Sequence, residues 1–150
     1  MVIFDFFDVN LYPHSLLLTT VGTAIHDNDY SRAVLFLETI GNSTEADAMW
    51  HNLATIALQQ QDLFLAERSF AGLGDVSKST FLRETREIGD KFCQNYNEDV
   101  SKCAEIWARL AILNMDLVTA ESIYLEQGDM QAALDMYKKL HKWDEAIRYL

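Results

Sequence analysis

A spacing rule that recurs four times along the chain constrains its fold more than any other feature. In each copy an Asp is followed by Ala four positions later and by a large apolar residue eight positions later. The copies are Asp29/Ala33/Leu37, Asp62/Ala66/Phe70, Asp116/Ala120/Tyr124 and Asp129/Ala133/Tyr137. An Asp at a helix start accepts hydrogen bonds from unpaired backbone N–H groups and complements the helix dipole. Because residues four apart share a helix face, the rule predicts capped helices that approach one another closely at the Ala.

Helical periodicity continues from Ser15 to the last residue. We predict helices over residues 15–26, 30–40, 45–60, 63–73, 78–94, 101–114, 117–127, 130–140 and 143–150. The breaks between these helices are short and polar, and helices joined by short loops form antiparallel hairpins.

A longer internal repeat supports this reading of the chain. Trp50-x-x-Leu53-Ala54 recurs as Trp107-x-x-Leu110-Ala111, and Ala66-Glu67-x-x-Phe70 recurs as Ala120-Glu121-x-x-Tyr124. The first pair is offset by 57 positions and the second by 54, so we expect three residues to be missing from the second hairpin loop. The spacing of the Trp50 copy is that of a tetratricopeptide repeat. The sequence therefore predicts an all-α, degenerate tetratricopeptide-like αα-hairpin solenoid over residues 14–150, with Trp50 and Trp107 buried between hairpins.

The first thirteen residues differ from the rest and are predicted to form a separate N-terminal strand or extended arm. Residues 2–7 are aromatic and β-branched, which favours a strand, and Pro13 ends it. A lone strand needs a partner, so this one pairs outside the chain or packs on the helices. No basic stretch precedes the apolar residues, so we do not expect a signal peptide.

Charge and composition exclude several classes of function. Twenty-three acidic residues against twelve basic ones give a formal net charge of -11, which is the wrong sign for binding nucleic acid or an acidic membrane. A membrane span needs about 18 consecutive apolar residues, and the sequence has no such run. Two cysteines, Cys93 and Cys103, suit a reducing compartment. We therefore expect a soluble cytoplasmic protein or fragment.

One stretch approaches a phosphate-binding loop without completing it. Gly72 and Ser77-Lys78-Ser79 have the required spacing, but Ser77 replaces the second Gly of the motif. A helix is predicted before this stretch, where the motif requires a strand. We interpret it as a Gly-Asp turn between two helices.

A second stretch imitates a calcium loop. Asp27, Asp29 and Ser31, with Glu38 at the twelfth position, match several ligand positions, but Arg32 stands where the loop needs Gly. The residues that follow belong to an amphipathic helix, so we interpret Asp29 as the cap of that helix.

The remaining polar residues suggest neither catalysis nor metal binding. The histidines have no metal-ligand spacing, and the cysteines lack a Cys-x-x-Cys partner. The histidines are His14, His26, His51 and His141. Cys103, near a helix start, is expected to be a buried and inert thiol. Asn42-Ser43-Thr44 is expected to form a turn and a cap. The basic cluster Lys138, Lys139, His141 and Lys142 is expected to be solvated at a helix end. We predict no catalytic, cofactor-binding or metal-binding residue, and hence no enzyme.

Several ordered strings resemble one known family. They include Gly22-Thr23-Ala24-Ile25, Asp29-Tyr30-Ser31-Arg32-Ala33-Val34, Phe36-Leu37-Glu38-Thr39, Ala48-Met49-Trp50, Ala66-Glu67-Arg68-x-Phe70-x-x-Leu73-Gly74-Asp75-Val76 and Tyr137-Lys138-Lys139-Leu140-His141-Lys142-Trp143-Asp144-Glu145. Their order and spacing over residues 20–150 resemble the family of the largest peripheral subunit of intraflagellar transport complex B. Coatomer subunits, which share a propeller-plus-solenoid plan, are the second resemblance.

The resemblance implies a place and a role for the chain. The family carries tandem β-propellers followed by a tetratricopeptide-like solenoid, so residues 1–13 would belong to the end of a propeller and residues 14–150 to the solenoid. The implied function is a non-enzymatic scaffold that supports the assembly of transport trains in cilia. Other intraflagellar transport subunits are the implied partners, and the cytoplasm, cytoskeleton, cilium or flagellum and basal body are the implied locations.

Two further expectations concern binding. A tetratricopeptide module for short peptides is the alternative to a scaffold, and His51 and Arg109 would be its basic residues, although the repeated first helices carry few such groups. Trp143, Ile147 and Leu150 are expected to be exposed on the last helix and to cause weak self-association.

Overall fold

The computed structural model describes residues 14–150, and these residues form nine α-helices and one short 3-10 helix. The α-helices are α1 (His14–His26), α2 (Tyr30–Ile40), α3 (Thr44–Gln60), α4 (Leu63–Gly72), α5 (Val76–Tyr96), α6 (Ala104–Leu113), α7 (Leu117–Glu126), α8 (Met130–Lys139) and α9 (Trp143–Ile147). Within this part of the chain, the predicted all-α solenoid class and all nine predicted helices are confirmed. The strand or arm predicted over residues 1–13 lies outside the described residues.

Two helix boundaries differ from the prediction by three residues, and the others differ by two at most. The helix predicted over residues 101–114 begins at Ala104, because Val100–Lys102 forms a separate 3-10 helix (η2) that Asp99 caps. The last helix was expected to reach residue 150, but α9 ends at Ile147.

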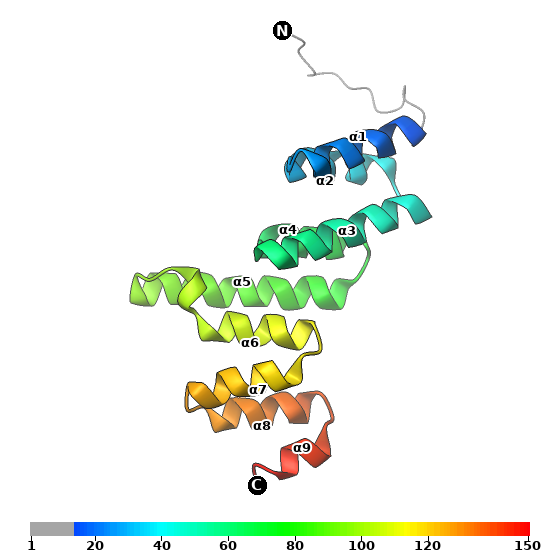
Figure 1. Cartoon of the computed structure of the whole chain (residues 1–150). Helices are drawn as coiled ribbons and strands as arrows, with labels where there is room; N and C mark the ends of the chain where they lie inside the picture. The colour runs from blue at the N-terminus through cyan, green and yellow to red at the C-terminus, as the bar shows by residue number, and fades with distance from the viewer. Residues whose placement is uncertain (1–13) are drawn as a thin grey trace. The chain divides into compact units, whose positions relative to one another are not determined.

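The chain divides into two units, the first ending at Arg83 and the second beginning at Glu84. In the first unit α1 packs on α2, α3 packs on α4, and the two pairs meet through α1–α3, α2–α3 and α2–α4 contacts (Figure 1). In the second unit α6 packs on α7, α7 on α8 and α8 on α9. Within each unit, helices therefore contact mainly their neighbours in sequence, as the solenoid prediction requires.

The four Asp residues of the recurring rule cap helices as predicted. The carboxylate of each accepts a hydrogen bond from the backbone N–H three residues later. The donors are Arg32, Leu65, Thr119 and Ala132, at 3.2, 3.0, 3.2 and 2.9 Å. Asp75 does the same for Lys78 at 3.1 Å, and Ser43 caps α3 through Ala46 at 3.1 Å.

The same Asp residues also end the preceding helix, which the sequence did not reveal. The Asp29, Asp62, Asp75, Asp116 and Asp129 N–H groups each donate to a carbonyl five residues earlier, at 2.8–3.0 Å. The residue before each Asp has a left-handed backbone, with φ between 59° and 76°. This is the Schellman arrangement that closes helix C-termini. Each of these five helix reversals thus needs only one left-handed residue and one Asp.

The Ala and large positions of the rule form the core. Ala33, Ala66, Ala120 and Ala133 are completely buried. The four large side chains that follow them are also buried, from 1% exposed at Leu37 to 7% at Phe70 and Tyr124. Because each Ala presents only a methyl group, the facing helix approaches closely, and the larger residue fills the next turn.

The prediction for Trp107 is wrong, whereas that for Trp50 is confirmed. Trp50 is 4% exposed, but Trp107 is 37% exposed and its indole N–H donates to the Ser101 carbonyl at 2.8 Å. The register of the repeat is set by the turns, because left-handed Gln61 and Met115 are 54 positions apart. At that offset the buried Ala108 corresponds to Ala54, and Trp107 corresponds to Leu53.

The expectation that three residues are missing from the second hairpin loop is also wrong, because the turns keep the offset of 54 positions. The two loops correspond residue for residue at Gln61–Asp62 and Met115–Asp116, so nothing is missing from the turn. Gly72 gives a second reason why Trp50 is buried and Trp107 is not. A Cβ at Gly72 would lie 2.4 Å from Cε2 of Trp50, so the ring lies against this glycine. The corresponding residue in α7 is Glu126, so the second hairpin has no such seat for a tryptophan ring.

We predict that Ala66→Trp destabilises the protein by at least about 3 kcal/mol, because the completely buried site cannot accept an indole ring. Ala71→Trp is the matched control, since Ala71 is exposed on the same helix. Thermal and urea unfolding followed by circular dichroism would measure both. Equal midpoints for the two variants would contradict the packing described for α4.

Gly72→Ala is predicted to lower the free energy of unfolding by about 1–3 kcal/mol through the clash with Trp50. Helix propensity alone would favour Ala by about 1 kcal/mol, so the sign of the change is informative. Gly22→Ala, where a Cβ meets nothing within 4 Å, should instead raise stability by about 0.5–1 kcal/mol. Stabilisation of both variants in urea titrations would show that the Trp50 ring does not lie on Gly72.

Candidate interaction surface

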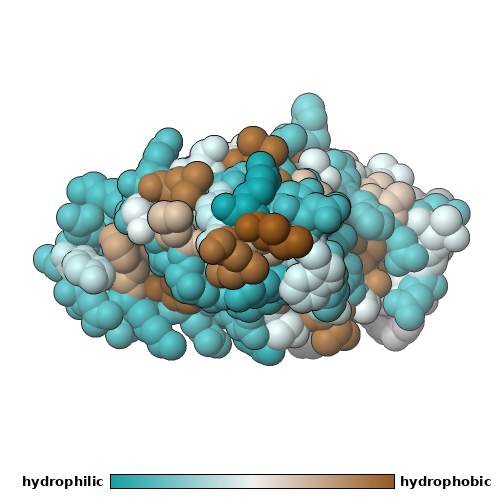
Figure 2. All heavy atoms as spheres, turned by 90° about the horizontal axis from the view of Figure 1, so that it is seen from below, coloured by the Kyte–Doolittle hydropathy of each residue, from teal (hydrophilic) through white to brown (hydrophobic). Residues whose placement is uncertain are grey.

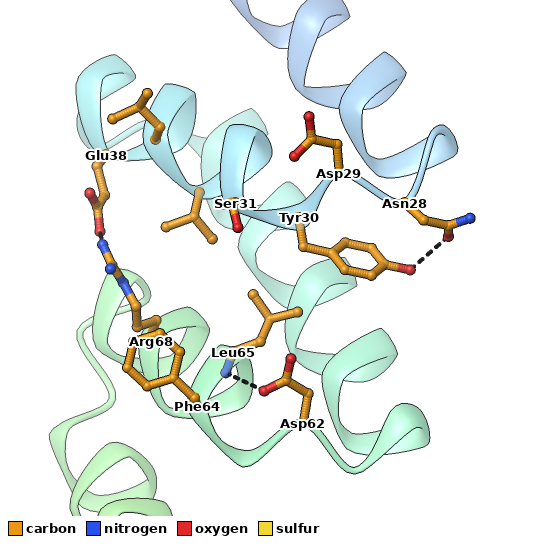
Figure 3. Close-up of a pocket in the computed structure, with 11 residues that line it drawn as sticks. Asn28, Asp29, Tyr30, Ser31, Glu38, Asp62, Phe64, Leu65 and Arg68 are labelled. Carbon is orange, nitrogen blue, oxygen red and sulfur yellow. Dashed lines mark hydrogen bonds and ion pairs between the residues drawn. The ribbon is translucent and has the colours of Figure 1, made fainter.

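A groove of about 440 Å³ lies in the first unit between α2 and α4 (Figure 3). Val34 and Leu65, which are 5% and 6% exposed, form its floor. Leu35 and Phe64 form its apolar walls and are 61% and 55% exposed. The groove therefore continues the core to the surface and offers apolar side chains to a binding partner.

Polar contacts fix the two ends of the groove. At one end Arg68 of α4 donates to the Glu38 carboxylate of α2 and forms an ion pair with it (Figure 3). At the other end the Tyr30 hydroxyl donates to Asn28 at 2.8 Å and accepts from the Gln60 side chain at 3.0 Å. These contacts link α2 to α4 and to the end of α3, so the groove is held open by the fold itself.

The lining of the groove is acidic. It contains the carboxylates of Asp29, Glu38 and Asp62 and the guanidinium of Arg68. Neither His nor Cys is among its lining residues. The groove thus offers apolar side chains and carboxylates to an apolar and basic surface.

The two basic residues of the alternative peptide-binding module, His51 and Arg109, have different surroundings. Arg109 is engaged inside the second unit, where its Nε donates to the Thr85 hydroxyl at 2.8 Å and its Nη2 lies 3.4 Å from Glu84. Its side chain is only 16% exposed. His51 is exposed on α3 in the first unit. Arg109 therefore takes part in the internal contacts of the second unit, and His51 is exposed in the first.

The two incomplete motifs occupy helix ends. Ser77–Ser79 lie in the first turn of α5, whose cap is Asp75, and the Lys78 ammonium lies 5.2 Å from the centre of the Phe70 ring. In the other motif, Arg32 forms ion pairs with Asp27 and Asp29 at 3.6 and 3.7 Å. In the first motif the Lys78 ammonium also lies 3.5 Å from the Asp75 carboxylate. In the second, Arg32 neutralises two of the carboxylates that a calcium ion would need.

The two cysteines are free thiols of the second unit. Cys103 is buried at the start of α6 and Cys93 is half-buried near the end of α5. Residues 14–150 contain no group of three or more His, Cys, Asp or Glu side chains placed to hold a metal ion. None of the helices described in this range is long and apolar enough to cross a membrane.

A hydrogen-bonded carboxylate holds the last helices of the second unit together. Glu121 of α7 accepts from the Tyr137 hydroxyl of α8 at 2.8 Å and from the Tyr149 hydroxyl after α9. The bond from Tyr149, followed by that from Tyr137, lowers the pKa of Glu121. Burial, together with the bond to Glu121, raises the pKa of Tyr137 to about 12. The sequence marked Glu121 and Tyr137 only as repeat positions, and nothing in their spacing indicated this contact.

The residues expected to be exposed at the last helix are exposed. Trp143, Ile147 and Leu150 are 56%, 64% and 88% exposed. Figure 2, which views the chain from the side where α9 lies in Figure 1, shows hydrophobic atoms surrounded by hydrophilic ones. The basic residues Lys138, Lys139, His141 and Lys142 are also exposed, as expected. Self-association through this surface stays a prediction.

Capped antiparallel helices with buried alanines, together with a surface groove, define a tetratricopeptide-like helical-repeat protein. A family model described as "IFT80/172/WDR35/WDR19 TPR domain" matches residues 49–149. The match covers more than half of the chain, so this protein belongs to that family.

Individual relatives agree with the family model. The chain is 48% identical over 130 residues to intraflagellar transport protein 172 homolog of Drosophila melanogaster and 44% identical over 130 residues to that of Homo sapiens. It is 36% identical over 127 residues to intraflagellar transport protein 172 of Chlamydomonas reinhardtii. These matches cover 85–87% of this chain but only 7% of each relative. No solved structure shows a significant match. The predicted resemblance to the complex B subunit is confirmed.

We predict that Glu121→Gln lowers the free energy of unfolding by about 1 kcal/mol at pH 7, because the charged acceptor of two tyrosine hydroxyls is lost at a partly exposed site. Since the folded-state pKa of Glu121 lies below its ordinary value of 4.5, its contribution is present above that pH and is lost as pH falls through the folded-state pKa. The difference between variant and parent should therefore shrink as the pH is lowered through the folded-state pKa.

Urea titrations at several pH values would measure this difference. Glu126→Gln, an exposed change on the same helix, is the control and should have little effect at any pH. A difference for Glu121→Gln that is as large at pH 3 as at pH 7 would contradict the role assigned to the carboxylate.

Proposed function

We propose that this chain is a non-enzymatic scaffold segment of the intraflagellar transport machinery. Membership of residues 49–149 in the IFT80/172/WDR35/WDR19 TPR domain family is the observation that carries this proposal. Relatives from animals and a green alga are named intraflagellar transport proteins. These names support a location in the cilium or flagellum, and we propose the basal body as part of that location.

The proposed mechanism is recognition over helix surfaces without turnover. Short helices stacked on their neighbours present side chains along a row, and such rows bind partners over a broad area. The acidic groove between α2 and α4 and the exposed apolar residues of α9 are surfaces of this kind. Other subunits of the intraflagellar transport complex are the proposed partners, and residues 1–13 are proposed to link the solenoid to a preceding β-propeller.

We expect the tagged chain, expressed in ciliated cells, to recover intraflagellar transport subunits as its main specific partners. Quantitative mass spectrometry of the captured proteins would measure the enrichment. The Ala66→Trp variant is the control, because disrupted packing of α4 should remove partners that need the folded helices. Enrichment of coatomer subunits in place of intraflagellar transport subunits would reject the proposal in favour of a vesicle-coat scaffold.

A further inference from the structure

We propose that the groove between α2 and α4 is the docking site for an amphipathic helix of a partner protein, one that carries basic residues beside its apolar stripe. The inference rests on the proposed scaffold function and specifies the chemistry of one partner. The structure contributes apolar anchor positions, a fixed groove shape and a charge pattern, and these are argued in turn.

One apolar wall of the groove, Leu35, is unusual for its place in the repeat. Leu35 lies six positions after the capping Asp29, on the solvent side of α2. The corresponding residues after the other three capping Asp residues are all polar, namely Arg68, Ser122 and Asp135. The other copies thus place a polar residue at this exposed position, so exposure to solvent does not account for the leucine. Leu35 and the exposed Phe64 flank a floor that is already part of the core, as a site for the apolar side chains of a bound helix requires.

The groove is formed before any partner binds. Arg68 and Glu38 join its two helices at one end, and Tyr30 donates to Asn28 at the other end (Figure 3). The Gln60 side chain donates to the same Tyr30 hydroxyl. A binding site that is already ordered avoids the entropic cost of ordering on association. Its volume of about 440 Å³ lies within the common range of binding pockets, roughly 300–1,000 Å³.

The negative charge of the groove lining indicates what kind of helix would bind there. The lining holds three carboxylates and one guanidinium. Arg32 beside the groove pairs with Asp29 and with Asp27, so four carboxylates still outnumber two guanidinium groups. Asp29 and Asp62 are fixed in place by their capping bonds. Basic side chains beside the apolar stripe of a bound helix would meet these carboxylates. A second copy of this chain has a net charge of -11 and is disfavoured by its sign. The N-terminal residues 2–8 are disfavoured in the same way, because they carry only acidic charges.

A synthetic helical peptide of leucine and lysine, about 18 residues or ~27 Å long, is the probe for this proposal. A peptide with the same leucine spacing and glutamate in place of lysine tests the sign of the charge. Fluorescence anisotropy with the full chain would measure both affinities. We expect the leucine–lysine peptide to bind, its affinity to fall with added salt, and the leucine–glutamate peptide not to bind.

Two sets of variants locate the binding. Leu35→Ser with Phe64→Ser should weaken binding at least about ten-fold by removing both apolar anchors, whereas Val118→Ser, an exposed change on α7, should not. Asp29→Asn with Asp62→Asn should weaken binding roughly three- to ten-fold at low salt. Asn caps helices as well as Asp does, so stability should be kept. Asp116→Asn with Asp129→Asn removes the same charge from two caps of the second unit and should have little effect.

The outcomes separate this inference from the proposed function. Equal weakening by both Asp pairs, or no effect of the Leu35 and Phe64 changes, would show binding governed by net charge and would overturn the docking site. A dimer seen by sedimentation and lost in the Leu35→Ser, Phe64→Ser variant would assign the groove to a second copy instead. Either result, with intraflagellar transport subunits still captured from ciliated cells, would reject the groove proposal and leave the scaffold function intact.

Discussion

The fold depends on an Asp that belongs to two helices at once. Its N–H donates to a carbonyl of the helix that ends, and its carboxylate accepts from the helix that begins, as at Asp62 between α3 and α4. These two roles occupy one residue because the preceding residue is left-handed. The left-handed residue and the Asp therefore set the direction of the helix that follows. That direction places the Ala, four positions after the Asp, against the neighbouring helix.

Packing and turn geometry together decide which residues reach the surface. The buried Ala positions leave room only for close helix contacts, so large side chains must fill the next turn or face solvent. Trp50 is buried because Gly72 leaves space for its ring, and Trp107 is partly exposed in a hairpin that has Glu126 in the corresponding place. Leu35 and Phe64 face solvent beside the same core, and this gives the first unit its apolar and acidic groove.

Much of this arrangement was predictable, because it depends on local rules. The capping Asp, the Ala and the large residue interact within eight positions, so their spacing predicted the helices and most of the core. The left-handed turn residues were not predictable as a class, because Asn28, Gln61, Met115 and His141 share no side-chain property that demands that backbone. The groove and the Glu121 contacts join residues that are 16 to 30 positions apart, and no local spacing encodes such pairs. The tryptophan motif misled because it matched at 57 positions while the turns repeat at 54.

Because the capping Asp serves two helices, it restricts where residues can be inserted into this chain. A residue inserted between Gln61 and Asp62 would separate the left-handed position from the Asp that follows it, and both helix ends would lose their hydrogen bonds. Insertions are tolerated where no residue is shared in this way, and the stretch from Asn97 to Asp99, between α5 and η2, is such a place. A reporter loop or a cleavage site belongs there, since each reversal at a shared Asp has no residue to spare.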